Sequence, residues 1–179
     1  GKPREGDDIV IVGLGGVGMA ALLAAVSLGV GRVIGVDAVP AKLETALELG
    51  ADVALSPDDA IAQGLRAAVV VEAAGHPKAF ETAFALTAAG GTTVTVGLPR
   101  ADARSSLSPL TFTAEARTVI GSYLGSAVPA RDIPRYEQLW REGRLPVEAL
   151  VTSEIGLDEL NEALDTLADG KAIRQVVRF

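Results

Sequence analysis

The sequence predicts an α/β fold, a doubly wound parallel sheet of the Rossmann type with strand order 3-2-1-4-5-6. Short apolar runs rich in Val and Ile alternate along the chain with Ala- and Leu-rich segments of helical length. This alternation is typical of parallel strands joined by right-handed helical crossovers. The apolar runs are unbroken, as expected of strands covered on both faces. A glycine-rich turn directly after the first run is the third indication.

The expected elements follow from these runs and from the Gly and Pro residues between them. The strands of the sheet are expected at residues 9–12, 33–36, 51–55, 67–71, 92–96 and 118–123. The helices between them are expected at 16–28, 40–49, 57–66 and from Gly75-His76-Pro77 to about 89. Residues 100–116 are expected to be irregular. A C-terminal extension of the same domain, about 125–179, is expected to hold helices at 129–142 and 157–169 and strands at 151–155 and 173–179.

The amino-acid composition excludes several classes of function and of binding site. The 179 residues suit one domain, and 16 Lys and Arg against 23 Asp and Glu give a formal charge of -7. This balance argues against a nucleic-acid or anionic-membrane surface, which would need a basic patch. The chain has no Cys and a single His, His76, so disulfides and a Cys/His zinc site are excluded. We therefore expect no metal ligands in this chain.

Residues 9–30 carry no charge and are long enough to suggest a membrane span. Four glycines interrupt this stretch in its middle, and no basic segment or cleavage site precedes it. A buried strand, a tight turn and a buried helix explain it better. With no signal peptide and no span, we expect a cytoplasmic protein.

The segment Gly13-Leu14-Gly15-Gly16-Val17-Gly18 fits the pattern G-x-G-x-x-G. It follows an expected strand and opens an expected helix, which is the context that this motif requires. Gly13 permits the tight turn, Gly15 lets the backbone approach a pyrophosphate, and Gly18 lets the helix pack closely on the strand. The helix N-terminus supplies unpaired N–H groups and partial positive charge, so an acidic protein can still bind an anionic dinucleotide there.

Asp37 lies about 20 positions after the motif, at the end of the second expected strand. A carboxylate at this place accepts hydrogen bonds from the ribose hydroxyls of the adenosine and repels a 2′-phosphate. The sequence therefore predicts NAD rather than NADP as the cofactor.

Several segments together resemble the cofactor domain of the zinc-dependent medium-chain alcohol dehydrogenase family. They are VIVGLGGVGMAALLAAVSLGVGRVIGVD, VVVEAAG, TVTVGLP, IGSYLGS and the closing DELNEALDTLADGKAIRQVVRF. The tail pattern GK-x-IR-x-V with a final Phe is more specific to this family than the glycine motif. The resemblance covers essentially the whole chain. It implies an enzyme that transfers hydride between an alcohol or aldehyde substrate and NAD(H).

The resemblance also implies further cofactor contacts. Lys42 matches a family lysine near the adenosine ribose, and Arg174 matches an arginine that clamps the pyrophosphate. Residues at the strand ends that line the cofactor crevice are Ala74, Gly97 and Leu98. Backbone groups at Ser122, Tyr123 and Leu124 fall where the family binds the nicotinamide carboxamide.

This chain departs from the family in one large respect. Family members carry a GroES-like catalytic domain with Cys and His zinc ligands ahead of the cofactor domain, and the chain lacks these residues. We therefore name no catalytic residue and expect the chain alone to be inactive, with zinc held only by the missing domain. His76, just before Pro77, is interpreted as a helix-entry residue.

Two other functions stay open. A zinc-free quinone or enoyl reductase would share the fold, but such relatives usually prefer NADPH, and Asp37 counts against that choice. A nucleotide-binding module without chemistry is the second alternative, which the family-specific tail disfavours.

Relatives commonly form dimers through the last strand of this sheet. Here that strand is Thr118–Tyr123, which contains no proline and no charge. As an edge strand it would present unpaired backbone groups. We expect a homodimer, unless Arg117 and the irregular segment before it cover this edge.

Overall fold

The computed structural model describes all 179 residues, and it confirms the doubly wound sheet. Six parallel strands lie in the order β3-β2-β1-β4-β5-β6. Their bounds are β1 Ile9–Val12, β2 Val33–Val36, β3 Val53–Leu55, β4 Ala67–Glu72, β5 Thr87–Thr95 and β6 Thr118–Gly121.

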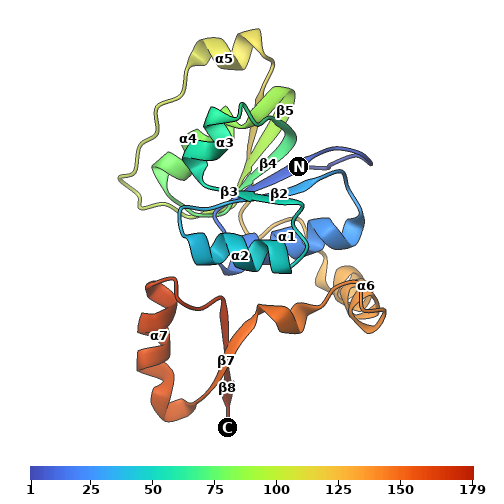
Figure 1. Cartoon of the computed structure of the whole chain (residues 1–179), viewed down its shortest axis with the longest axis vertical. Coiled ribbons are helices and arrows are strands. Elements are labelled where there is room, and N and C mark those ends of the chain that lie inside the picture. The colour runs from blue at the N-terminus through green and yellow to red at the C-terminus, as the bar shows by residue number, and fades with distance from the viewer.

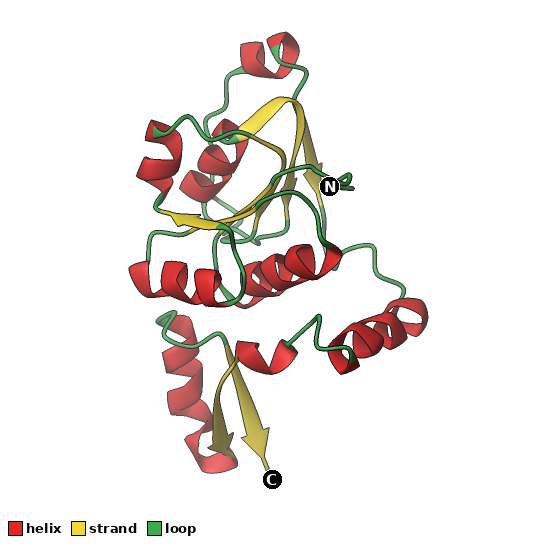
Figure 2. Ribbon diagram, turned by 45° about the vertical axis from the view of Figure 1, so that its right-hand side comes forward, coloured by secondary structure: helices red, strands yellow, loops and turns green.

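Helices cover both faces of this sheet (Figure 1). The helices α1 and α2 lie below it in this view, and α3 and α4 lie above it. Their bounds are α1 Gly16–Leu28, α2 Pro40–Glu48, α3 Pro57–Ala62 and α4 Pro77–Ala85. Figure 2 shows the same layers from another side. Strands buried on both sides explain the unbroken apolar sequences of β1 and β2, in which every residue is buried.

The chain after β6 forms a smaller unit beneath α1 and α2 (Figures 1 and 2). It contains a separate parallel two-stranded sheet of β7 and β8. Its elements are α6 Pro129–Arg141, a 3₁₀ turn η1 Val147–Leu150, β7 Val151–Gly156, η2 Leu157–Glu159, α7 Leu160–Ala168 and β8 Arg174–Arg178. Leu145 and Leu150 are buried in the cluster that contains Leu22 and Leu23 of α1, so they attach this unit to the sheet domain.

Several expected boundaries are wrong, and three of them lie between residues 57 and 95. The helix expected to reach about residue 89 ends at Ala85, because Leu86 is fully buried and Thr87 already pairs with Ala67 in β5. The register of β5 then shifts, so the strand begins five residues before the expected Thr92. The helix expected to run to Arg66 stops at Ala62, where Gly64 adopts a positive φ of 65°.

The segment expected to be irregular contains a short helix, α5 Pro109–Ala114. It begins at a Ser108-Pro109 pair, which suits a first helical turn. Phe112 packs on Phe84 of α4, with ring centroids 4.6 Å apart. The last strand of the sheet is also shorter than expected and ends at Gly121 rather than at Tyr123.

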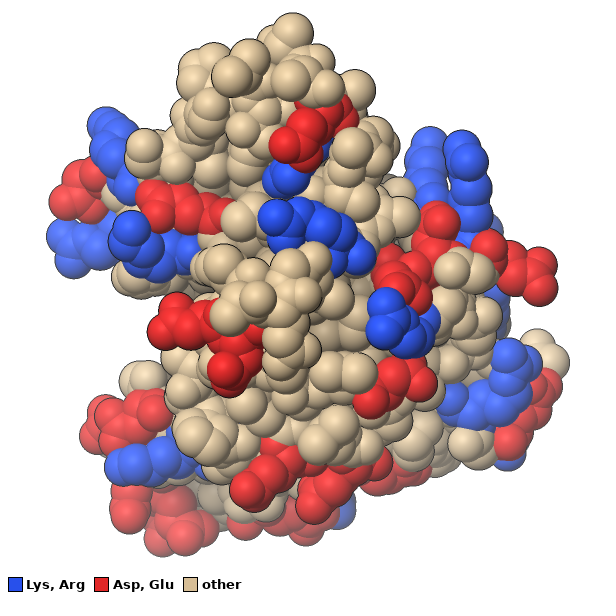
Figure 3. Space-filling model, turned by 45° about the horizontal axis from the view of Figure 1, so that its top comes forward, with Lys and Arg blue, Asp and Glu red and all other residues tan.

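Each helix of the chain is too short or too polar to span a lipid bilayer. The long uncharged stretch is β1, a turn and α1, as the sequence predicted. On the face shown in Figure 3, Lys and Arg side chains alternate with Asp and Glu, and no large basic patch forms.

Candidate functional site

The glycine turn after β1 is held tightly between two strand ends. Gly13 has φ of 92°, a conformation that residues with a Cβ rarely adopt, and its N–H donates to the carbonyl of Val36 at 2.8 Å. A Cβ on Gly13 would lie 2.6 Å from the backbone nitrogen of Ala74. The turn thus joins the carboxyl ends of β1, β2 and β4, and glycine is required where it does so.

Gly18 and Gly15 serve different purposes. A Cβ on Gly18 would collide with the carbonyl oxygen of Gly13, so this glycine lets α1 pack against the turn, as predicted. A Cβ on Gly15 would meet no atom within 4 Å and would enter open space in front of the helix. A dinucleotide pyrophosphate fits this space only if no side chain fills it.

The N-terminus of α1 is electrostatically open. The N-cap of this helix is Gly15, which has no side chain to cap it, and the first turn of the helix contains no acidic residue. Val17 in this turn is 56% exposed. The guanidinium of Arg174 lies beside Gly16, since a Cβ there would be 3.2 Å from its Cζ. The positive end of a 13-residue helix and an arginine therefore face the same space.

Asp37 follows β2 and is tied to the glycine turn. Its Oδ2 accepts the N–H of Leu14 at 2.7 Å, and its Oδ1 accepts the N–H of Val39 at 2.9 Å. The ammonium of Lys42 lies 3.9 Å from Oδ2. Each carboxylate oxygen can accept more than one hydrogen bond, so Asp37 is oriented by the backbone and still able to bind hydroxyl groups.

A buried carboxylate that sequence reasoning missed organises the ends of β4 and β5. Glu72 is 1% exposed. It accepts N–H groups of Ala74 and Gly75 at 2.8 and 2.7 Å and the hydroxyl of Thr95 at 2.7 Å. The available signal was one acidic residue ending the apolar run VVVE. Because all these bonds orient the turn after β4, Glu72 shapes one wall of the crevice.

The turns after β4 and β5 touch each other. A Cβ on Gly97 would collide with the backbone nitrogen of Gly75, and a Cβ on Gly75 would lie 2.9 Å from Leu98 backbone atoms. Ala74, Gly97 and Leu98 are thus brought to one edge of the sheet, as expected. Leu98 is 72% exposed there.

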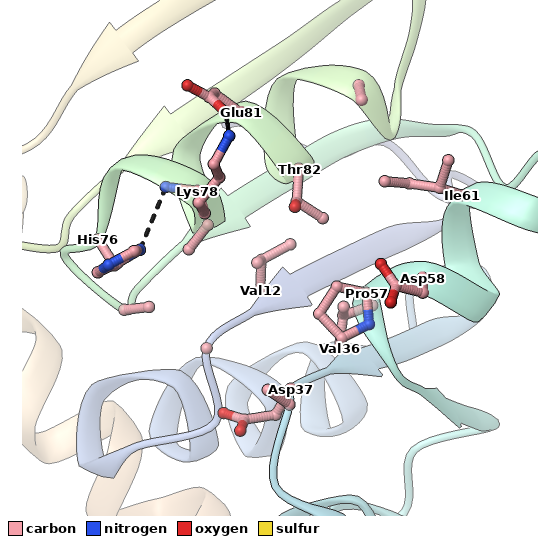
Figure 4. A pocket seen from close by; sticks show the side chains of 15 residues that line it. Val12, Val36, Asp37, Pro57, Asp58, Ile61, His76, Lys78, Glu81 and Thr82 are labelled. Carbon is pink, nitrogen blue, oxygen red and sulfur yellow. Dashed lines mark hydrogen bonds and ion pairs between the residues drawn. The ribbon is translucent and has the colours of Figure 1, made fainter. Parts of the chain in front are cut away.

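A cavity of about 730 Å³ opens beside this edge. Figure 4 shows Val12, Val36 and Asp37 on the strand side, with α3 and α4 forming the opposite walls. Gly13 and Ala74 were predicted as cofactor contacts and line it together with Asp37. The other lining residues, none of them predicted as cofactor contacts, are Val12, Val36, Ala38, Pro57, Asp58, Ile61, His76, Lys78, Ala79, Glu81, Thr82 and Ala85.

His76 is the N-cap of α4, which confirms its interpretation as a helix-entry residue. Its Nδ1 accepts the N–H of Lys78 at 3.2 Å (Figure 4). On the same helix, Glu81 accepts the N–H of Ser106 and pairs with Lys78 at 2.9 Å. These two bonds lower the pKa of Glu81 below its usual range, with the Ser106 bond the larger cause. The Ser106 bond also fastens the loop after β5 to α4.

Ser122, Tyr123 and Leu124 lie beyond β6 and do not line the large cavity. The N–H of Ser122 already donates to the carbonyl of Thr95 at 2.9 Å. Tyr123 and Leu124 are 71% and 88% exposed, and Leu124 has a positive φ of 58°. Of the three, only Tyr123 and Leu124 keep backbone N–H groups outside the sheet ladder.

The chain is similar to alcohol dehydrogenases in both sequence and structure. Alcohol dehydrogenase 1 of Cenchrus americanus is 34% identical over 188 residues, covering 99% of this chain and 49% of that protein. The structure of an alcohol dehydrogenase zinc-binding domain protein from Burkholderia ambifaria matches with a TM-score of 0.91 and 30% identity, covering 98% of this chain and 49% of that one. Benzyl alcohol dehydrogenase of Acinetobacter calcoaceticus matches with a TM-score of 0.93 and 26% identity, covering 99% and 51%.

A family model described as zinc-binding dehydrogenase matches residues 16–142. The chain belongs to the zinc-binding dehydrogenase family. It spans about half the length of the relatives that it matches. The resemblance expected from the sequence is therefore confirmed.

The residues matched by the family model include α1, Asp37 and Lys42 but end before β7. Arg174 lies outside the matched residues, yet the fold returns it to the glycine turn. In this chain, no three His, Cys, Asp or Glu side chains converge in a group suited to hold a metal ion.

Proposed function

We propose that this chain is the NAD(H)-binding portion of an alcohol dehydrogenase-type oxidoreductase that transfers hydride between an alcohol and NAD. The observation that carries the proposal is the open, uncapped N-terminus of α1 at Gly15, with Asp37 held next to it by the Leu14 N–H. The membership of the zinc-binding dehydrogenase family and the alcohol dehydrogenases among its relatives support it.

The anionic part of the cofactor would bind at the start of α1. The N–H groups of Gly16, Val17 and Gly18 supply donors and the positive end of the helix dipole, and Arg174 adds a full positive charge. Asp37 would accept the ribose hydroxyls, with Lys42 beside it. The large cavity beyond Asp37 has the apolar lining that suits a planar adenine ring, including Ala38, Ile61 and Ala79.

The nicotinamide end would lie at the opposite side of the turn, near Gly97, Leu98 and the backbone of Tyr123 and Leu124. When bound, NAD⁺ would accept a hydride from the alcohol, or NADH would donate one to the aldehyde, and these residues would only orient the nicotinamide ring. The zinc ion and the proton-transfer groups of the family would belong to a GroES-like domain of a longer protein. The substrate would be a small alcohol or aldehyde.

Titration of the chain with NADH, followed by calorimetry, tests the proposal. We expect saturable binding at one site per chain. Gly15→Ala should abolish most of this affinity, because its methyl group enters the space for the pyrophosphate. A chain that shows no saturation with NADH contradicts the proposed function.

An activity assay tests whether the zinc and the catalytic groups lie outside this chain. We expect the purified chain to retain no stoichiometric zinc and to reduce no NAD with a series of primary and secondary alcohols. Elemental analysis and absorbance at the NADH band measure the two quantities. Turnover by this chain alone would show that the catalytic groups lie within it.

We further propose a homodimer through β6 and the residues that continue it to Tyr123. The strand is at the edge of the sheet, and Ile120 is 45% exposed. Arg117 does not cover this edge, because its guanidinium turns inward to Glu115 and the carbonyl of Phe84. Pairing of two such edges about a two-fold axis would continue the sheet.

The register of β6 selects the residue for the test. The N–H of Ser122 donates to β5. Because successive N–H groups of a strand point to opposite sides, the N–H of Ile120 also points toward β5, and the N–H of Val119 points away from the sheet. Val119→Pro removes this N–H and should shift the sedimentation coefficient from that of a dimer to that of a monomer. Val119→Ala keeps the N–H and should leave the dimer intact. A monomeric wild-type chain, or a dimer unchanged by Val119→Pro, contradicts this assembly.

A further inference from the structure

The strand pair β7–β8 contains an irregularity next to the site. Val151 pairs with Arg174 and Ser153 pairs with Gln175, so Thr152 is an extra residue with no partner across the sheet. Bulges of this kind are rare between parallel strands and often re-aim a side chain beside a functional site. This one lies at the first residue of β8, which is Arg174.

The extra residue is bonded to the start of the neighbouring strand through its side chain. The hydroxyl oxygen of Thr152 accepts the N–H of Ile173 at 2.8 Å and, more weakly, the N–H of Arg174 at 3.4 Å. The hydroxyl thus binds the backbone just where the chain enters β8.

Residues 173 and 174 in turn contact the first residue of α1. A Cβ on Gly16 would lie 3.2 Å from the carbonyl oxygen of Ile173 and 3.2 Å from the Cζ of Arg174. No carboxylate of the chain lies within 4.0 Å of the Arg174 guanidinium. An unpaired cation beside the positive end of a helix is unfavourable without an anion between them, which indicates that this place is built for one.

We propose that Thr152 is a positioning residue for the anion site. Its hydroxyl fixes the backbone of Ile173 and Arg174, and so holds the Arg174 guanidinium over the first turn of α1. The inference rests on the proposed function, because the anion it serves is the pyrophosphate of the dinucleotide. In this proposal Thr152 acts through Arg174 and not by direct contact with the dinucleotide.

The test is a double-mutant cycle on NADH affinity, measured by calorimetry. Thr152→Val keeps the shape and removes the acceptor, and we expect it to weaken NADH binding about fivefold. Thr152→Ser keeps a hydroxyl and should bind within twofold of wild type. In an Arg174→Ala background, Thr152→Val should have no further effect. Thr166→Val removes a hydroxyl bond to Glu162 on α7 and should leave the affinity unchanged.

Two results of the affinity measurements would overturn the inference. The first is unchanged affinity in Thr152→Val. The second is a fivefold loss that persists in the Arg174→Ala background, because it would show that Thr152 acts on the fold and not through Arg174. Hydrogen exchange of the Ile173 amide needs no ligand, and it should be faster in Thr152→Val. If wild type fails to bind NADH, the proposed function is wrong, and unchanged Ile173 exchange would separately contradict the contact.

Discussion

The six-stranded unit and the C-terminal unit differ sharply in how they bury apolar surface. The residues of β1 and β2 are all buried, and α1 adds Met19, Leu22 and Leu23. After β6, the buried apolar residues are only Leu145, Leu150 and Ala163. Two of those three belong to the cluster around α1 rather than to a core of their own.

The C-terminal unit instead exposes much of its apolar surface. Leu160, Leu164 and Leu167 of α7 are 36%, 53% and 44% exposed. Its ion pairs, such as Arg178 with Glu154, lie at the surface and contribute little to stability. The sheet unit therefore contains most of the buried apolar core, while the C-terminal unit packs on α1 and places Arg174 beside the glycine turn.

The largest expected effect breaks the sheet unit itself. Gly18→Ala should destabilise the chain by more than about 3 kcal/mol, because its Cβ collides with the Gly13 carbonyl and separates α1 from the turn. Gly15→Ala is the matched control and should change stability by less than about 0.5 kcal/mol. Urea unfolding measures both. Equal losses of stability would contradict the separate roles of these two glycines.

A smaller loss of stability is expected when the contact between the two units is weakened. Leu145→Ala removes a buried contact with the α1 cluster, and we expect a loss of about 2–3 kcal/mol. Hydrogen exchange should become faster in residues 126–179 and stay nearly unchanged in β1. Leu164→Ala, at an exposed position, should cost less than about 0.5 kcal/mol. Uniformly faster exchange throughout the chain would show that the two units unfold as one.

The smallest effect concerns pH and the start of α6. Asp132 accepts hydrogen bonds from the side chain of Arg131 and from the N–H of Val128, and these lower its pKa from 3.8 to about 2. A carboxyl with a depressed folded-state pKa stabilises the fold above its unfolded pKa, and this contribution is lost as pH falls through the folded value. Asp132→Asn should therefore be less stable than wild type at neutral pH.

The difference between Asp132→Asn and wild type should close as pH falls from about 4 to about 2. Thermal unfolding over this range measures it. Asp165→Asn is the control, because that carboxylate forms neither a hydrogen bond nor an ion pair. A stability difference between Asp132→Asn and wild type that stays constant down to pH 2 would argue against the stated cause.

The sequence was most informative where local and tertiary preferences agree. The strands at Ile9–Val12 and Val33–Val36 and the helix at Gly16–Leu28 match the predicted bounds, because uninterrupted apolar runs are buried on all sides. The same agreement places the glycine turn beside Asp37.

The sequence did not predict features that depend on tertiary packing. The early end of α4 depends on burial of Leu86 against the core, which helix propensity does not encode. The walls of the large cavity depend on which faces α3 and α4 turn toward the strand ends. The Thr152 bulge is a shift of a single residue between strands, and no local pattern marks it.

The preference between NADH and NADPH tests the central claim most directly, namely that Asp37 and the start of α1 form a binding site for NAD(H). Calorimetric titration of wild type should show at least about tenfold tighter binding of NADH, which corresponds to roughly 1.4 kcal/mol. Asp37→Ala should weaken NADH binding and narrow the gap to NADPH, because the carboxylate both accepts the ribose hydroxyls and repels a 2′-phosphate. Equal affinity of wild type for the two nucleotides would contradict the account.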